Sequence, residues 1–311
     1  MSGCLRKLNH AEHKSVHIQD SFWSPKLELI QTTTLWDIIR KFESDHEEGI
    51  TKNYEWVIEG KTGRHIGPPW YDGLICEVIR GVHHNRASFP RYMGEYAQDH
   101  CPIELQSEAV GHAVRAALMY TGLAAVGMET GDRKYLDVAK RLWDNVATTK
   151  LHISGGIGAE HKEEKFGSQY DLPNDAYLET CAGVAFAFWA GEMHCAFGDA
   201  SYMDAFECAL YNNVLPALSM DGTHYFYENP LISDGSVKRW DWHVCPCCPP
   251  MFIKLMGCLQ DYIYSFSADS IYGNLHIGSS FTKDFGDGPV TVSQKNCALP
   301  SAPLPSVRGV P

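Results

Sequence analysis

The sequence predicts a mainly α-helical fold built from helical hairpins, and three observations support this prediction. Apolar residues recur with helical spacing through the middle of the 311-residue chain. Two pairs of helical segments match each other at a constant offset of 67 residues, as from Gly131 to Gly198. A strand-like pattern begins only after about residue 266. Stacked hairpins form either an open solenoid or a closed α/α toroid, and the repeat alone is compatible with both.

The first helix is expected in residues 24–44, where apolar side chains follow the helical period. Ser24 is a suitable N-cap. Pro25 suits the first helical position, because the amide hydrogen that proline lacks has no helical partner there.

Each repeated hairpin joins a helix rich in alanine and glycine to an amphipathic helix through a Gly-Asp turn. The hairpins cover residues 107–146 and 179–214. The small-residue helices suit an inner layer and the amphipathic helices an outer one. The same offset places His112 over Glu179, so two polar side chains are expected on one rim. The other aligned pairs are Asp132 with Asp199, Tyr135 with Tyr202, Asp137 with Asp204, and Asn145 with Asn212.

The sequence changes character after the hairpins. Ile271, Leu275 and Ile277, with glycines between them, predict strand. The tail is rich in Pro, Ser and Ala. We therefore expect a helical domain in residues 1–266, the start of a β-domain in 267–285, and a disordered tail in 286–311.

Composition limits the classes of partner and the compartment. The net charge is −12 and no basic stripe occurs, which argues against nucleic-acid and anionic-membrane partners. The N-terminus is polar, and no apolar run reaches the roughly 18 residues of a spanning helix. We expect a cytoplasmic protein. In that reducing compartment the 11 cysteines point to metal binding or catalysis rather than to disulfides.

Residues 241–250, "DWHVCPCCPP", crowd three cysteines before two prolines. Pro249 and Pro250 fit the first turn of a helix, so Cys247 and Cys248 lie at a helix N-terminus that stabilises thiolates. Cys245 could replace Cys247 as a ligand. A vicinal disulfide is disfavoured because adjacent cysteines bridge only with strain.

A second pair of ligand types occurs at the start of another helix. Glu179 and Cys181 share a side only if the chain is still extended there. With Cys247 and Cys248 they make a four-ligand set of the type that Zn²⁺ accepts. A structural and a catalytic zinc site are both open at this point.

The segment "SGGIGAEHKEEKFGSQYDLPND", residues 154–175, has the glycine-rich, polar composition of a functional loop. Glu163 and Glu164 could supply a general acid. A solvated charge run is the alternative.

Six motifs occur along the chain in this order: "FWSPK", "GHAVRA", "SGGIG", "YDLPNDAYLETCA", "FYENPL" and "CCPP". Together, and in family order, they resemble the family 127 glycoside hydrolases, the β-L-arabinofuranosidase group. The resemblance implies an (α/α)6 toroid followed by β-sandwich domains. It also implies a retaining glycosidase acting on β-linked L-arabinofuranose or a similar sugar, with a cysteine nucleophile.

The resemblance implies a role for each matched residue. The zinc ligands would be Glu179, Cys181, Cys247 and Cys248. Cys247 would be the nucleophile, and Glu164 the acid/base, with Glu163 as a one-residue alternative. His112 and Tyr227 would contact the sugar.

The chain departs from the family in three places. Met251 follows "CCPP" where the family has asparagine, the chain is shortened near residues 80–92, and most of the β-domains are absent. The toroid is therefore expected to be incomplete, and its uncovered apolar surface could pair with a second copy in a homo-oligomer. The alternatives to an active glycosidase are an inactive zinc-binding relative and a helical scaffold.

Overall fold

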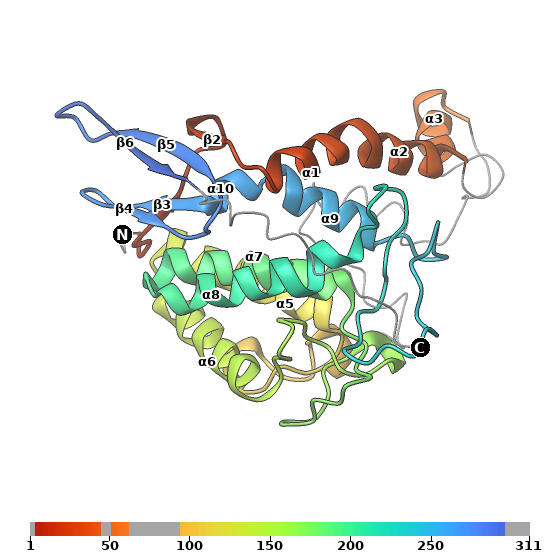
Figure 1. The fold of residues 1–311 in the computed structure, drawn as a ribbon. Coiled ribbons are helices and arrows are strands. Elements are labelled where there is room, and N and C mark those ends of the chain that lie inside the picture. The colour runs from red at the N-terminus through yellow and green to blue at the C-terminus, as the bar shows by residue number, and fades with distance from the viewer. Residues whose placement is uncertain (1–3, 45–50, 62–93, 296–311) are drawn as a thin grey trace, which may run out of the picture.

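The computed structural model describes residues 4–44, 51–61 and 94–295 (Figure 1). Within these ranges the chain is mainly helical, with two small sheets. The α-helices are α1 (Trp23–Leu29), α2 (Leu35–Ser44), α3 (Thr51–Ile58), α5 (Ala113–Thr130), α6 (Arg133–Thr149), α7 (Thr180–Phe197), α8 (Ala200–Ala209), α9 (Cys248–Gly257) and α10 (Leu259–Ile263). None of the helices in the described ranges is both long and apolar enough to cross a membrane.

The two predicted hairpins are α5–α6 and α7–α8, and their turns are built alike. Gly131 and Gly198 both end their helices in the left-handed region, with φ of 68° and 71°. The aspartates that follow are both N-caps: the Asp132 carboxylate accepts from the Lys134 amide, and the Asp199 carboxylate from the Ser201 amide. The 67-residue repeat is therefore confirmed at the level of backbone conformation.

The first helix begins at Trp23, two residues before the expected first helical residue Pro25, and is capped differently. Its first residue is Trp23, and the Oδ1 atom of Asp20 accepts from the amides of Phe22 and Trp23 at 2.8 Å each. The prediction that Ser24 is the N-cap is wrong, because the helix begins before Ser24 and the side chain of Asp20 accepts from the amides at its start. A π-helical turn, Ile30–Thr34, joins α1 to α2.

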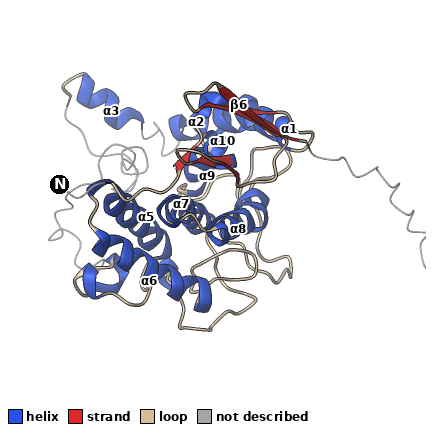
Figure 2. Cartoon of the chain, turned by 90° about the vertical axis from the view of Figure 1, so that its left-hand side faces the viewer, coloured by secondary structure: helices blue, strands red, loops and turns tan. Residues whose placement is uncertain are grey.

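Helix α7 lies at the centre of the molecule and packs against α5, α8 and α9 (Figures 1 and 2). It is apolar on all sides, as expected for a helix that is surrounded by others. Aromatic side chains fill the space between α7 and α6: the ring of Trp143 stacks on Phe186 at 5.0 Å and meets Trp189 edge-on. This packing holds the middle of α7 in place, and the site lies at the N-terminal end of the same helix.

Both sheets combine strands from the two ends of the chain. One has the order β1–β3–β4 and the other β2–β5–β6, all antiparallel. In the second sheet Val16 pairs with Phe281. The strands are β1 (Asn9–His10), β2 (Val16–Ile18), β3 (Tyr264–Phe266), β4 (Ile271–Gly273), β5 (Ser279–Asp284) and β6 (Pro289–Gln294).

The expected boundaries of the β region differ from those in the structure. Ile271 lies in a strand, whereas Leu275 and Ile277 are fully buried in the connection that follows. The expectation of a disordered tail from residue 286 is wrong for β6, because this strand completes a hairpin with β5. Residues 296–311, like the expected deletion near 80–92, lie outside the described residues.

Candidate active site

The N-termini of three helices converge on one place. His112 is the N-cap of α5, Glu179 the N-cap of α7, and Cys247 the N-cap of α9, with Cys248 as the first residue of that helix. His112 and Glu179 therefore share one rim, as the repeat predicted. The positive ends of the helix dipoles favour anionic side chains here.

Three sulfur atoms and one carboxylate form a compact cluster. The Sγ atoms of Cys181 and Cys248 are 3.4 Å apart, and that of Cys247 lies 3.8 Å from Cys248 Sγ. The Oε1 atom of Glu179 is 3.3 Å from Cys247 Sγ. All four ligand atoms lie within 4.8 Å of one another. The structure thus brings together the four residues predicted as zinc ligands.

The local backbone explains how Glu179 and Cys181 share a side. Glu179 has φ −52° and ψ 139°, so the chain is extended at the N-cap, and the helix begins at Thr180. The extended backbone predicted at this point is therefore present.

The cluster fits a bound cation. Burial, and then the nearby thiol of Cys247, raises the pKa of Glu179 well above its usual range, and burial likewise raises that of Cys181. The Oε2 atom of Glu179 is buried and has no hydrogen-bond partner. An unpartnered buried carboxylate oxygen is costly unless another group binds it. Three sulfurs and one carboxylate are a donor set that zinc accepts.

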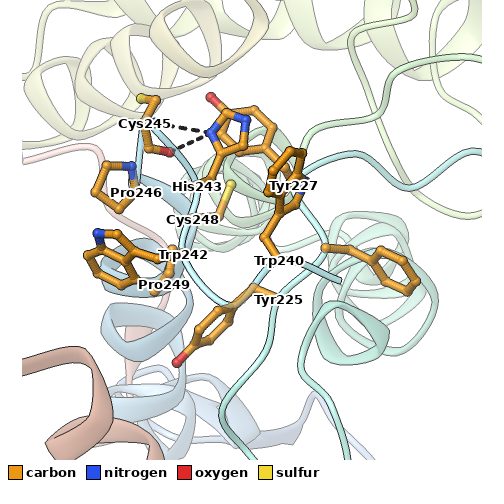
Figure 3. Close-up of a pocket in the computed structure, with 10 residues that line it drawn as sticks. Tyr225, Tyr227, Trp240, Trp242, His243, Cys245, Pro246, Cys248 and Pro249 are labelled. Atoms are coloured by element: carbon orange, nitrogen blue, oxygen red, sulfur yellow. Dashed lines mark hydrogen bonds between the residues drawn. The ribbon is translucent and has the colours of Figure 1, made fainter. Parts of the chain in front are cut away.

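Cys245 lies beside this cluster but is not one of its four members. The neighbouring thiol of Cys247, and then burial, raises the pKa of Cys245. Its amide donates to Nδ1 of His243 at 3.1 Å, and its carbonyl oxygen lies 3.2 Å from the same nitrogen (Figure 3). These contacts fix the main chain of Cys245.

Glu164 is the carboxylate that reaches the site from the glycine-rich loop. Its Oε2 atom lies 2.9 Å from His112 Nε2, and its Oε1 atom accepts from the hydroxyls of Tyr227 at 3.0 Å and Tyr177 at 3.1 Å. Burial alone would raise the pKa of Glu164, but the hydrogen bonds from His112 and the two tyrosines outweigh it, and the pKa is lowered. In the site without substrate these donors favour the ionised carboxylate, which is the form of Glu164 that can accept a proton.

Glu163 points elsewhere. Its carboxylate is 3.6 Å from Lys165 Nζ, and its side chain is 47% exposed. Both residues have left-handed backbones, with φ of 60° at Glu163 and 55° at Glu164. This tight turn separates the directions of the two side chains and brings only Glu164 to the cluster.

Tyr227 connects the two halves of the site. Its hydroxyl oxygen is 3.0 Å from Glu164 Oε1 and 3.3 Å from Cys247 Sγ. Burial, together with the nearby Glu179, raises the pKa of Tyr227, so its hydroxyl remains a donor. The Thr180 amide donates to the Tyr227 carbonyl at 2.9 Å and ties this segment to the start of α7.

Tyr177 is a site residue that was not predicted from the sequence. It stands two positions before Glu179, the same spacing as Glu179 to Cys181. That spacing within "YLETC" was the available signal, but the motif alone does not reveal a contact with Glu164.

Aromatic side chains enclose a small cavity behind Cys248. The cavity has a volume of about 10 Å³ and is lined by Tyr225, Trp240, Trp242 and His243, among others (Figure 3). Such a volume holds about one water molecule, so it is too small for a sugar. It is part of the packing that supports the loop before α9.

Known proteins that are similar to this chain include β-L-arabinofuranosidases. The sequence profile of the β-L-arabinofuranosidase GH127 catalytic domain matches residues 77–261. A non-reducing end β-L-arabinofuranosidase from Bifidobacterium longum subsp. longum is 36% identical over 217 residues, covering 66% of this chain and 33% of that protein. The chain thus spans about a third of the length of this curated relative.

Two solved structures are similar. A GH127 β-arabinofuranosidase superposes with a TM-score of 0.78 at 23% identity over 96% of this chain and 68% of its own, which shows a shared fold. A GH127 β-L-arabinofuranosidase from Geobacillus stearothermophilus T6 gives a TM-score of 0.63 at 34% identity over 78% of this chain and 37% of its own.

Proposed function

Because the chain belongs to the family of the β-L-arabinofuranosidase GH127 catalytic domain, we propose that it is a retaining glycoside hydrolase that releases L-arabinofuranose, or a similar sugar, from β-linked glycans. One observation carries the proposal. A single hydroxyl, that of Tyr227, contacts both the thiol of Cys247 and the carboxylate of Glu164. A nucleophile and an acid/base group therefore lie side by side at the same site.

Cys247 is proposed as the nucleophile and Glu164 as the acid/base. Cys247 is half-buried, whereas Cys181 and Cys248 are buried, so Cys247 has the sulfur that a substrate can reach. A zinc ion bound by Glu179, Cys181, Cys247 and Cys248 would keep the thiol of Cys247 ionised.

The proposed reaction has two displacements. In the first, the sulfur of Cys247 attacks the anomeric carbon while Glu164 protonates the glycosidic oxygen, so a C–S bond forms as the C–O bond breaks. In the second, Glu164 takes a proton from water, and the water oxygen replaces the sulfur. Two inversions retain the anomeric configuration, with sulfur in place of the usual carboxylate nucleophile.

His112 and Tyr227 are proposed to contact the sugar. Both contact the carboxylate of Glu164, at 2.9 and 3.0 Å, and the side chain of His112 is 13% exposed. Donors at this position can bind sugar hydroxyls.

We also propose that the helical region, assigned to residues 1–266, is an incomplete (α/α)6 toroid shortened near residues 80–92, and that a β-domain begins after it. The shared fold with the solved GH127 structure supports a helical, toroid-like arrangement. The cytoplasmic location and the homo-oligomer stay predictions from the sequence.

The proposal is tested by turnover of 4-nitrophenyl β-L-arabinofuranoside together with metal analysis. We expect release of 4-nitrophenol, a β-configured first product by NMR, and loss of turnover in Cys247→Ser but not in Cys4→Ser. Bound zinc without turnover would instead identify an inactive relative, and a metal-free, inactive protein would identify a helical scaffold.

A further inference from the structure

The proposed function leaves one hydroxyl at the site without a role, that of Tyr177. It donates to Glu164 Oε1 at 3.1 Å, and Tyr227 donates to the same oxygen at 3.0 Å. A carboxylate oxygen has two lone pairs, so these two donors fill Oε1. The other oxygen, Oε2, has one hydrogen-bonding or ion-pair partner among the described residues, His112.

The tautomer of His112 determines whether its Nε2 atom donates a hydrogen bond to Oε2 of Glu164. The Arg115 amide lies 3.4 Å from His112 Nδ1, which therefore accepts and has no hydrogen. The ring hydrogen is then on Nε2 and points to Glu164 Oε2. Oε2 thus keeps one lone pair free, whereas Oε1 keeps none.

We propose that Tyr177 is a positioning residue for Glu164: with Tyr227 it occupies Oε1 and so makes Oε2 the oxygen that carries the transferred proton. This inference rests on the proposed acid/base role of Glu164. In the first displacement the Oε2–H bond breaks, the proton goes to the glycosidic oxygen, and the leaving group departs as an alcohol. The electron pair left on Oε2 is the base in the second displacement.

The backbone and the ring of Tyr177 are held by contacts that do not involve its hydroxyl. Its amide donates to the Ala159 carbonyl, its carbonyl accepts from the Asn229 amide, and its ring meets His161 edge-on at 5.0 Å. These contacts do not involve the hydroxyl, so they persist in Tyr177→Phe.

The test compares two β-L-arabinofuranosides on wild type and Tyr177→Phe. A 2,4-dinitrophenyl leaving group departs without a proton, whereas a methyl leaving group needs one. We expect Tyr177→Phe to lower kcat/KM about tenfold or more for the methyl glycoside and less than about threefold for the dinitrophenyl glycoside. Zinc content and melting temperature should match wild type. Tyr170→Phe is the control, because Tyr170 is 73% exposed and lies in the same loop region.

A second measurement distinguishes an effect through Glu164 from a folding defect in Tyr177→Phe. If Tyr177 acts through Glu164, then Tyr177→Phe adds no further loss in a Glu164→Gln background assayed with the dinitrophenyl glycoside. Equal losses for both leaving groups, no loss for either, or a further loss in that background would overturn the inference. A wild-type chain inactive on both glycosides would overturn the proposed function itself.

Discussion

The sulfur atoms of Cys181 and Cys248 lie 3.4 Å apart, although 67 residues separate them in the chain. This separation equals the offset of the helical-hairpin repeat, from Gly131 to Gly198. Cys181 is the second residue of α7 and Cys248 the first of α9. The starts of α7 and α9 therefore lie beside each other, and the cysteines meet there.

Replacing Cys181 by serine should abolish zinc binding. The variant removes one of four ligand atoms that lie within 4.8 Å of one another. Because a ligand that binds only the folded state stabilises it, zinc-loaded wild type should melt at least about 5 °C above both the chelated protein and Cys181→Ser. Zinc stoichiometry by mass spectrometry and thermal unfolding measure the two effects. Cys4→Ser, at an exposed cysteine, should match wild type; a zinc-loaded Cys181→Ser would contradict the assignment.

Glutamine at position 164 should affect catalysis far more than glutamine at its neighbour. Glu164 contacts His112, Tyr177 and Tyr227, whereas Glu163 faces Lys165 and solvent. We expect Glu164→Gln to lower kcat about 10²–10⁴-fold on an unactivated glycoside, and Glu163→Gln to lower it less than threefold. Steady-state kinetics on both variants decide between the adjacent residues. The reverse order of effects would show that the turn reorganises when substrate binds.

The hairpins were predictable because they repeat a signal. Gly131 and Gly198 are both left-handed helix ends, and Asp132 and Asp199 both cap the following helix. Each turn has a physical requirement that few residue types meet. The ligand set was predictable from residue type, since one carboxylate and three cysteines at two predicted helix starts are a donor set that zinc accepts, and the family resemblance implied the same four residues.

The two sheets and the hydrogen-bond partners of Glu164 were not predictable from such a signal. Strand β1 spans two residues and β2 three, too few for a period-two pattern, and both depend on partners more than 240 residues away. Tyr177 reaches Glu164 only because the loop and the start of α7 fold together. Tertiary contacts of a single hydroxyl leave no periodic trace in a sequence.

Alanine at Gly183 should destabilise the protein through Asn213. A Cβ atom at Gly183 would lie 1.9 Å from Asn213 Oδ1 and 2.8 Å from its Cγ. Asn213 is fully buried and donates to the Leu178 carbonyl, so its side chain has no room to move. We expect a loss of about 1–3 kcal/mol in the free energy of unfolding. Gly122→Ala in α5, with open space around the new Cβ, should instead gain about 0.5–1 kcal/mol. Equal effects in urea unfolding would contradict this packing argument.

His10 joins the N-terminal strand β1 to the far end of α7 and is largely enclosed. Its Nε2 atom lies 3.3 Å from Cys195 Sγ and 3.8 Å from Glu192 Oε1, and its ring meets Tyr262 edge-on at 4.7 Å. Burial first, and then the nearby charges of His194 and Arg6, lowers the pKa of His10 from 6.5 to about 4. The folded protein therefore favours the neutral imidazole.

This lowered pKa should make stability fall with acid. Between pH 6.5 and 4, His10 is protonated in the unfolded chain but stays neutral in the folded protein. The free energy of unfolding therefore rises with pH across that window. The contribution is complete above pH 6.5 and is lost as the pH falls toward 4. We expect His10→Gln to remove about 2 kcal/mol of the decrease that wild type shows in urea unfolding between pH 7.5 and 4.5. His17→Gln, at an exposed histidine on β2, the next strand along the chain, should leave the decrease unchanged. An identical pH dependence in wild type and His10→Gln would contradict the prediction. It would mean that the packed His10 side chain binds a proton as readily in the folded protein as in the unfolded chain.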